Sequence, residues 1–346
     1  MNLARPQIGL DIGESSIKLS VVSKKGNKLS LDYAGILPIS TENGESPGES
    51  GMIVGLKTLF GNSSLKKSPV IMNYMGKAPL IRYLKFPEMP ENELAEAVQW
   101  EAKKIITEPV ESKVIDYAIL HKTAEEGKTA FEVILVVVDK SDVSEGLGIV
   151  RMAGVYPRLM DVNPLALLKV IELNHTSESG QDLVFIDIGS VKMEINICRG
   201  GVLRFTRQVV LGGKAISNAI MTKKSISFEE AELIKKETGL DDPEVEGVIK
   251  EEIDRMVLEV QRSIDYYRTQ FRDILLKKII LVGGTPLMPG FKEYFEGQFD
   301  LPVLLENPFS SMTGSPDLLK EVNPVGPLWA ASIGLALRGK FPEHAA

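Results

Sequence analysis

The chain has 346 residues, of which 44% are hydrophobic and 25% charged, as in an ordinary globular protein. A net charge of −7, one cysteine (Cys198) and three scattered histidines argue against a nucleic-acid-binding protein, a disulfide framework and a zinc cluster. No apolar run is long enough for a signal peptide or a membrane span, so we expect a cytoplasmic protein. The length predicts two domains, or one domain with a deep cleft.

The first half begins with a strand–turn–strand pattern. Residues 7–13 and 16–23 are predicted strands on either side of an Asp-Ile-Gly turn, and a third strand follows at 28–38. The next predicted elements are an exposed loop at 40–51, a helix near 52–60 and a strand near 68–74.

Residues 79–161 are predicted to form an inserted α+β module with its own small sheet. The predicted elements are, in order, a strand at 81–86, a helix at 91–106, strands at 113–121 and 130–139, a helix from 141 to about 153 and a closing strand at 156–162. The helix at 91–106 carries an apolar stripe of Leu94, Val98, Ala102 and Ile105.

The second half opens with another strand–turn–strand pattern. A helix that begins at Pro164 leads into it, and Cys198 is read as a buried thiol within one of its strands. The predicted elements are strands at 183–189, 193–199 and 202–210, mostly helical residues at 214–272 with the longest helix at about 243–272, a buried strand at 279–282 and a buried helix near 328–338.

A repeated phrase links the two halves. Residues 8–13 read IGLDIG and residues 184–189 read VFIDIG, so that Asp11 and Asp187 lie about half of the chain apart. An internal duplication describes the whole architecture, and two such units can face each other across a cleft. Each turn would then present backbone N–H groups and a carboxylate to a phosphate–metal group.

The residues around the first turn suit phosphate binding. Gly13 permits a tight turn, Ser15 and Ser16 supply hydroxyl groups, and Lys18 projects from the same side of its strand as Ser16. An ordinary hairpin with a surface lysine would carry the same residues. The pairs Gly212-Gly213 and Gly283-Gly284 would let the backbone approach a nucleotide closely, although each pair alone fits a plain turn equally well.

Five segments in a fixed order carry a resemblance to a known family. They read DIGESSIK at 11–18, DVNPLALL at 161–168, DIGSVKMEI at 187–195, LGG with EEAELIK at 211–213 and 229–235, and LVGGTPLMPG at 281–290. With these segments the chain resembles the actin-like ATPase superfamily, and within it most closely the PilM family of type IV pilus assembly proteins, which is related to FtsA. The resemblance covers nearly the whole chain.

The resemblance implies an α/β actin-like ATPase fold, with two duplicated large domains around a nucleotide cleft and an FtsA/PilM-type inserted small α+β module. The implied domains are a first large domain at 1–78 continued by 162–182 and the C-terminal helix 328–338, the inserted module at 79–161, a second large domain at 183–213 and 273–327, and a helical subdomain at 214–272.

The resemblance also implies that the cleft binds ATP with Mg²⁺. Glu232 and Lys235, with Lys236 adjacent, would contact ribose and adenine, although a solvated charged helix face would look the same. Asp11 and Asp187 would hold Mg²⁺ through water, and together with Asn163 they are the candidate catalytic positions. The implied nucleotide-binding residues are Asp11, Gly13, Ser15, Ser16, Lys18, Asp187, Gly189, Ser190, Gly212, Gly213, Glu232, Lys235, Lys236, Gly283, Gly284 and Thr285.

Four positions depart from the superfamily pattern. Glu14 stands where relatives carry a small hydroxyl residue, and Val191 and Lys192 replace small and hydroxyl residues of the second turn. Asn163 stands where many relatives carry a glutamate that activates water, and an amide cannot accept the proton. The sequence therefore predicts weak or absent hydrolysis even where ATP binds.

The implied function is that of a cytoplasmic scaffold in pilus assembly, located at the inner membrane only through a partner. Its partner would be the N-terminal cytoplasmic peptide of a PilN-like single-pass membrane protein, held in a groove formed by strand 81–86, helix 91–106 and strand 156–162. The scaffold would couple the inner-membrane platform to the pilus motor. The sequence does not decide whether the protein forms a homodimer. The alternatives are an FtsA-like or actin-like polymerising ATPase, a GspL-like component of a type II secretion platform, and a small-molecule kinase.

Overall fold

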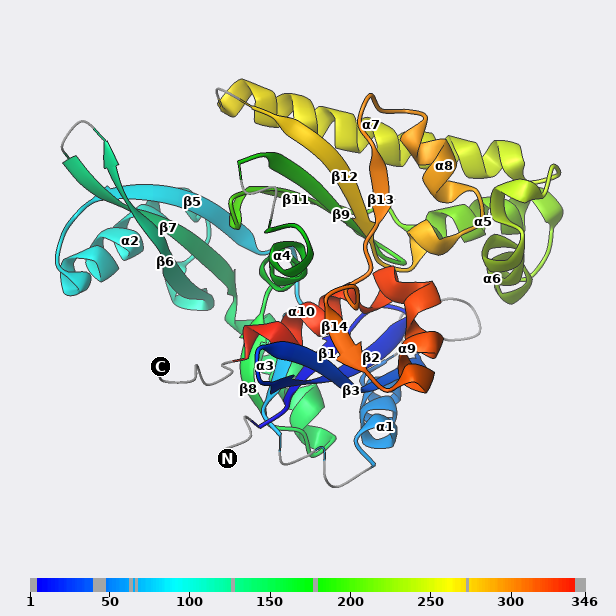
Figure 1. The fold of residues 1–346 in the computed structure, drawn as a ribbon, viewed down its shortest axis with the longest axis horizontal. Helices are drawn as coiled ribbons and strands as arrows, with labels where there is room; N and C mark the ends of the chain where they lie inside the picture. The colour runs from blue at the N-terminus through cyan, green and yellow to red at the C-terminus, as the bar shows by residue number, and fades with distance from the viewer. Residues whose placement is uncertain are drawn as a thin grey trace. The chain divides into compact units, whose positions relative to one another are not determined.

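The computed structural model describes residues 5–39, 48–61, 65, 68–125, 128–176, 180–271 and 274–339. The chain divides into two compact units, one formed by residues 1–73 and 150–346 and the other by residues 74–149 (Figure 1). Most of the expected loop at 40–51 lies outside the described residues, and its last residues belong to helix α1 (Glu49–Leu59). None of the helices described here combines the length and apolar character of a membrane span.

The larger unit contains a six-stranded sheet, sheet A, with the strand order β14-β3-β2-β1-β4-β8. Strand β2 lies between β1 and β3 and is antiparallel to both, whereas β4 and β8 continue the sheet parallel to β1. The strands are β1 (Gln7–Ile12), β2 (Ser16–Lys25), β3 (Lys28–Pro38), β4 (Val70–Asn73), β8 (Pro157–Asp161) and β14 (Met312–Gly314).

A second sheet of the same unit, sheet C, repeats this arrangement. Its order is β11-β10-β9-β12-β13, with three antiparallel strands followed by two parallel ones. The registers also agree, because Asp11 lies opposite Lys18 and Asp187 lies opposite Glu194. This agreement supports the duplication inferred from the repeated phrase. The strands are β9 (Asp182–Ile188), β10 (Met193–Arg199), β11 (Val202–Val209), β12 (Leu276–Val282) and β13 (Val303–Leu305).

The predicted C-terminal helix forms as α10 (Ala330–Arg338), and its expected burial is confirmed. It packs directly on the backbone of β1 at Gly9, where a Cβ atom would overlap the carbonyl oxygen of Ser332. The hydroxyl groups of Ser20 and Ser332 are hydrogen-bonded at 2.7 Å beside this contact. Helix α4 (Asn163–Asn174) packs against α10 where Gly334 meets the backbone of Ala166.

One face of sheet C packs against helices. Met193, Ile195 and Ile197 alternate along β10 into this core, so Glu194 and Asn196 project from the opposite face. The long helix α7 (Glu246–Gln270), yellow in Figure 1, buries one apolar stripe in the same core and begins three residues later than Pro243, where we expected it. Cys198 is buried in β10, as predicted. The other helices of this half are α5 (Gly213–Lys224), α6 (Phe228–Glu237), α8 (Phe291–Glu296) and α9 (Pro316–Val322).

The smaller unit has a three-stranded sheet, sheet B, in the order β5-β7-β6. Helix α2 buries Leu94, Val98 and Ala102 against this sheet, but the fourth residue of the predicted stripe, Ile105, is 36% exposed. The elements are β5 (Leu80–Pro87), α2 (Glu91–Ile105), β6 (Lys113–Glu125) and β7 (Lys128–Asp139). Helix α3 (Lys140–Met152) begins in the smaller unit and ends in the larger one.

The placement of one predicted strand was wrong. The strand expected at 156–162 forms as β8, but it pairs with β4 in sheet A instead of closing the small sheet. Its short apolar pattern shows that it is a strand and does not show which sheet it joins, because the choice depends on pairing with residues far away in the sequence.

Candidate functional site

The two Asp-Ile-Gly turns lie at the ends of β1 and β9 and have the same internal geometry. The amide of Gly13 donates to the carbonyl of Ser16 at 3.0 Å, and the amide of Gly189 donates to the carbonyl of Lys192 at 2.9 Å. Because both amides are used to close their turns, these two glycines shape the turns, and their own N–H groups are not available to a ligand.

The first turn carries a buried ion pair. Lys18 Nζ lies 3.0 Å from Asp11 Oδ2, and the two side chains are 10% and 8% exposed. The side chain of Asn73 at the end of β4 holds the turn, because its Oδ1 accepts from the Ile12 amide at 2.8 Å and its Nδ2 donates to the Ile12 carbonyl at 3.0 Å. Ser16 is buried and Ser15 is exposed.

The second turn carries two carboxyl groups where the first carries an ion pair. Burial, with a smaller contribution from Asp11, raises the pKa of Asp187 to about 6. Burial also raises the pKa of Glu194 to about 7, against the opposing effect of Lys192. The influence of Asp11 on both groups indicates that the two turns belong to one electrostatic environment.

The predicted glycine pairs come together beside the second turn. Gly213 donates its amide to the Gly189 carbonyl at 3.0 Å, and Thr285 Oγ1 donates to the same carbonyl at 2.8 Å. A Cβ atom at Gly212 would lie 2.6 Å from the Ser190 carbonyl oxygen. The backbone of α5 can therefore approach the turn only because position 212 is glycine.

Gly283 lies on the other side of this turn. It has a φ of +92°, and a Cβ atom there would lie 2.5 Å from Asp187 Oδ1. Both observations require glycine. Its neighbour Gly284 has an ordinary negative φ and faces Leu328, so the structure gives the two glycines different surroundings.

The predicted pair on α6 forms a buried network next to Gly213. Lys235 Nζ donates to Ser217 Oγ at 2.8 Å and to the Gly213 carbonyl at 3.2 Å, and it forms an ion pair with Glu232. Burial lowers the pKa of Lys235. Burial would raise the pKa of Glu232, but the nearby charge of Lys235 and the hydrogen bonds from Lys235 and Ser217 outweigh it, so the pKa of Glu232 is lowered. Lys236 is 70% exposed and lies 3.3 Å from Glu232.

Asn163 begins α4 directly after β8, and its Oδ1 is buried without a hydrogen-bond partner among the described residues. Glu194 Oε2 is likewise buried without a hydrogen-bond partner among the described residues. The Glu194 side chain projects beside Asp187. Sequence reasoning missed both Glu194 and Asn73. Glu194 could have been found, since it follows Asp187 by the same seven residues that separate Lys18 from Asp11.

These residues fit a magnesium–nucleotide group. Lysine and serine side chains line the two turns, the glycines keep the backbone accessible, and Glu194 and Asn163 offer buried acceptor oxygens that hydrogens of water could satisfy.

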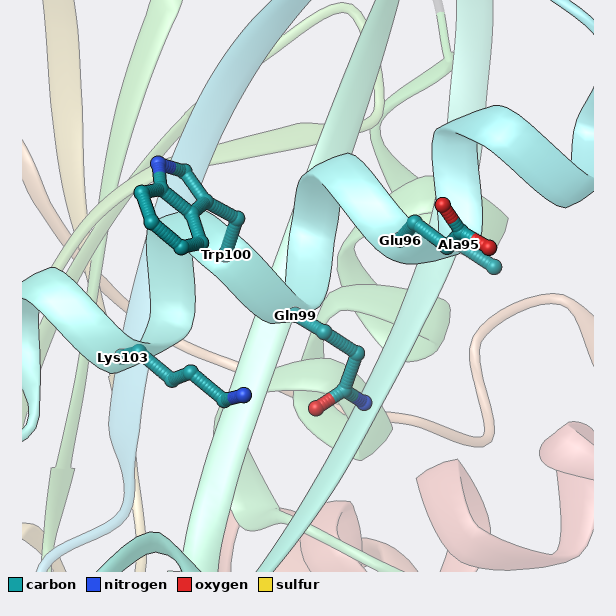
Figure 2. Close-up of a pocket in the computed structure, with 5 residues that line it drawn as sticks. All are labelled: Ala95, Glu96, Gln99, Trp100 and Lys103. Carbon is teal, nitrogen blue, oxygen red and sulfur yellow. The ribbon is translucent and has the colours of Figure 1, made fainter.

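Two exposed surfaces lie outside this site. Strand β8 is a terminal strand of sheet A, and Leu159 on it is 40% exposed while the preceding Tyr156 is 75% exposed. On the smaller unit, an open hollow runs along the outer side of α2, as Figure 2 shows. Trp100 there is 64% exposed. The hollow is lined by Ala95, Glu96, Gln99, Trp100 and Lys103.

Comparison with protein families identifies the chain. The model of the family described as type IV pilus assembly protein PilM matches residues 9–340, which is nearly the whole length. The chain belongs to the PilM family. The family expected from the five segments is therefore confirmed.

Solved structures of PilM and other proteins agree with this assignment. A chain from a PilM-PilN type IV pilus biogenesis complex is 26% identical, with a TM-score of 0.84 over 97% of this chain and 99% of that chain. The ethanolamine utilization protein EutJ from Carboxydothermus hydrogenoformans is 18% identical, with a TM-score of 0.58 over 97% and 89%. MreB 5 of Spiroplasma citri, bound to AMPPNP, is 12% identical, with a TM-score of 0.53 over 95% and 94%. The expected actin-like ATPase fold is confirmed.

Proposed function

We propose that this chain is a scaffold of type IV pilus assembly that binds the N-terminal cytoplasmic peptide of a PilN-like membrane protein. The observation that carries the proposal is the similarity, over almost the full length of both chains, to a chain from a PilM-PilN complex. The scaffold associates with the inner membrane only through this partner and couples the membrane platform to the pilus motor. The peptide is the part of the partner that a protein on the cytoplasmic side can reach.

We propose β8 as one surface that receives the peptide. A terminal strand has backbone groups that an extended peptide can pair with, and exposed apolar side chains beside it can contact alternate residues of the peptide. Leu159 on β8 and Tyr156 just before it are the exposed apolar residues here.

Replacing Leu159 with aspartate should weaken peptide binding at least about fivefold, because the loss of an apolar contact at the centre of an interface can cost more than about 1 kcal/mol. The measurement is fluorescence anisotropy of a labelled N-terminal peptide of a PilN-like protein.

The matched control for this variant is Leu304→Asp. Leu304 is also 40% exposed and also lies on a terminal strand, β13 of sheet C. Its replacement should leave peptide affinity unchanged. Equal losses in the two variants would argue against β8 as the peptide-binding strand.

We further propose that the two Asp-Ile-Gly turns bind ATP with Mg²⁺. Lys18 and the hydroxyl groups of Ser15 and Ser190 would contact phosphate, and the network of Glu232 and Lys235 would support the α5–α6 side that contacts ribose and adenine. Bound Mg²⁺ would neutralise phosphate charge, and the carboxylates of the turns would orient its waters. A general base that accepts the proton of the attacking water typically raises the rate of hydrolysis by about 10²–10⁴. The amide of Asn163 cannot accept this proton, so ATP hydrolysis is slow.

Calorimetric titration with ATP and Mg²⁺ should therefore show saturable binding, and the same protein should release little phosphate over many hours. Asp11→Ala should lose the binding, because Lys18 loses the carboxylate that positions it. Rapid phosphate release that disappears in Asp11→Ala would refute weak hydrolysis. A flat titration of the folded wild-type protein would refute the nucleotide site and leave the peptide-binding proposal intact.

A further inference from the structure

We propose that the two turns divide the charges of the magnesium–nucleotide group between them: the Asp11–Lys18 pair faces phosphate, and the Asp187–Glu194 pair holds the hydrated Mg²⁺, with Glu194 as a positioning residue. This inference rests on the proposed nucleotide site. It reassigns Asp11, which the sequence pattern placed on the metal together with Asp187.

The first observation is that equivalent positions carry opposite charges. Lys18 and Glu194 occupy the same register position opposite the aspartate of their turn. In the first turn, Asp11 already has a cation 3.0 Å away. In the second, the residue opposite Asp187 is another acid. A divalent cation gains more beside two carboxylates than beside a carboxylate that a lysine has already neutralised.

The second observation is an acceptor without a donor. Glu194 is 5% exposed, and its Oε2 has no hydrogen-bond partner in the described part of the chain. On its other side it lies opposite Gln208 of β11. A buried carboxylate oxygen needs a donor, and water bound to a cation is one such donor.

The remaining groups explain why the contact runs through water. Within the described residues, no set of three or more His, Cys, Asp or Glu side chains could hold a metal directly. Mg²⁺ retains several waters and commonly uses one or two carboxylates together with substrate phosphates.

The test measures ATP affinity by calorimetry across a series of Mg²⁺ concentrations. Mg²⁺ should raise the affinity for ATP. In Glu194→Gln, the Mg²⁺ concentration that gives half of the maximal increase in ATP affinity should rise about 10–100-fold, as is typical when a residue that orients metal-bound groups is lost. ATP affinity at saturating Mg²⁺ should stay close to that of the wild type. Electron paramagnetic resonance of Mn²⁺ in the ATP complex should show the same weakened metal binding.

Two further variants complete the design. Glu194→Asp keeps the charge and should recover part of the Mg²⁺ response, and it also serves if the Gln variant does not fold. Glu252→Gln removes another buried acid of the same half, on α7, and should leave the response unchanged.

An unchanged Mg²⁺ response in Glu194→Gln would overturn the inference. So would an equal loss of ATP affinity at every Mg²⁺ concentration, since that result indicates a merely structural role. If the wild-type protein binds no ATP at any Mg²⁺ concentration, the nucleotide site itself fails and this inference fails with it. The first two results would leave the nucleotide site standing.

Discussion

Replacing Gly9 with alanine should lower the free energy of unfolding by at least about 3 kcal/mol, the upper end of the usual range for overpacking. The added Cβ would overlap the carbonyl oxygen of Ser332 and lie 2.6 Å from the amide nitrogen of Ala336. Both are backbone atoms of α10, so no side chain can rotate to make room. The helix would have to leave β1, and it would lose the hydrogen bond between Ser20 and Ser332.

Urea unfolding followed by circular dichroism measures this loss, and the fluorescence of Trp329, buried just before α10, reports displacement of the helix. The control is Gly247→Ala in α7, where an added Cβ meets nothing within 4 Å. That substitution should stabilise the protein by about 0.4–1 kcal/mol, because alanine restricts the unfolded chain. Similar unfolding midpoints for Gly9→Ala and the wild type would show that α10 is not packed on β1 in this way.

The duplicated sheets were the most predictable part of the fold, because their signal is local and appears twice. The repeated phrase around Asp11 and Asp187 placed both turns, and the alternation of apolar residues placed the antiparallel strands. Strands of three residues such as β13 and β14 carry too little alternation to be recognised. The position of β8 in sheet A depends on pairing with β4, which lies far earlier in the chain, and a strand's own pattern does not encode its partner.

The candidate site shows the same limit. Gly212 and Gly283 could be proposed from sequence because a glycine pair after a strand is visible, but the reason for each glycine is a neighbour far away in the chain, namely Ser190 and Asp187. Asn73 could not be proposed, since its role is to hold the backbone of Ile12 across a parallel strand pair. A short-range pattern identifies which residues can bind, and long-range packing decides what holds them in place.

Removing the carboxylate of Asp11 should have the second large effect. In Asp11→Ala, Lys18 stays buried without the acid that now lies 3.0 Å from its ammonium group, and breaking a buried pair in this way costs about 3–5 kcal/mol of the free energy of unfolding. Lys18→Met should also destabilise the protein, because Asp11 then stays buried without its cation. The double variant should lose less than the sum of the two single losses, since it leaves no isolated charge.

This double-mutant cycle, measured by urea unfolding without nucleotide, decides how Asp11→Ala is to be used. A large coupling between Asp11 and Lys18 means that lost ATP binding in the single variant mixes an effect on folding with an effect on the site. The double variant, folded and without either charge, then becomes the proper control for the nucleotide titration. If the two losses simply add, Asp11 and Lys18 do not stabilise each other, and Lys18 is held in position by the strand alone. Asp11 would then be open to the metal, contrary to the division of charge between the two turns.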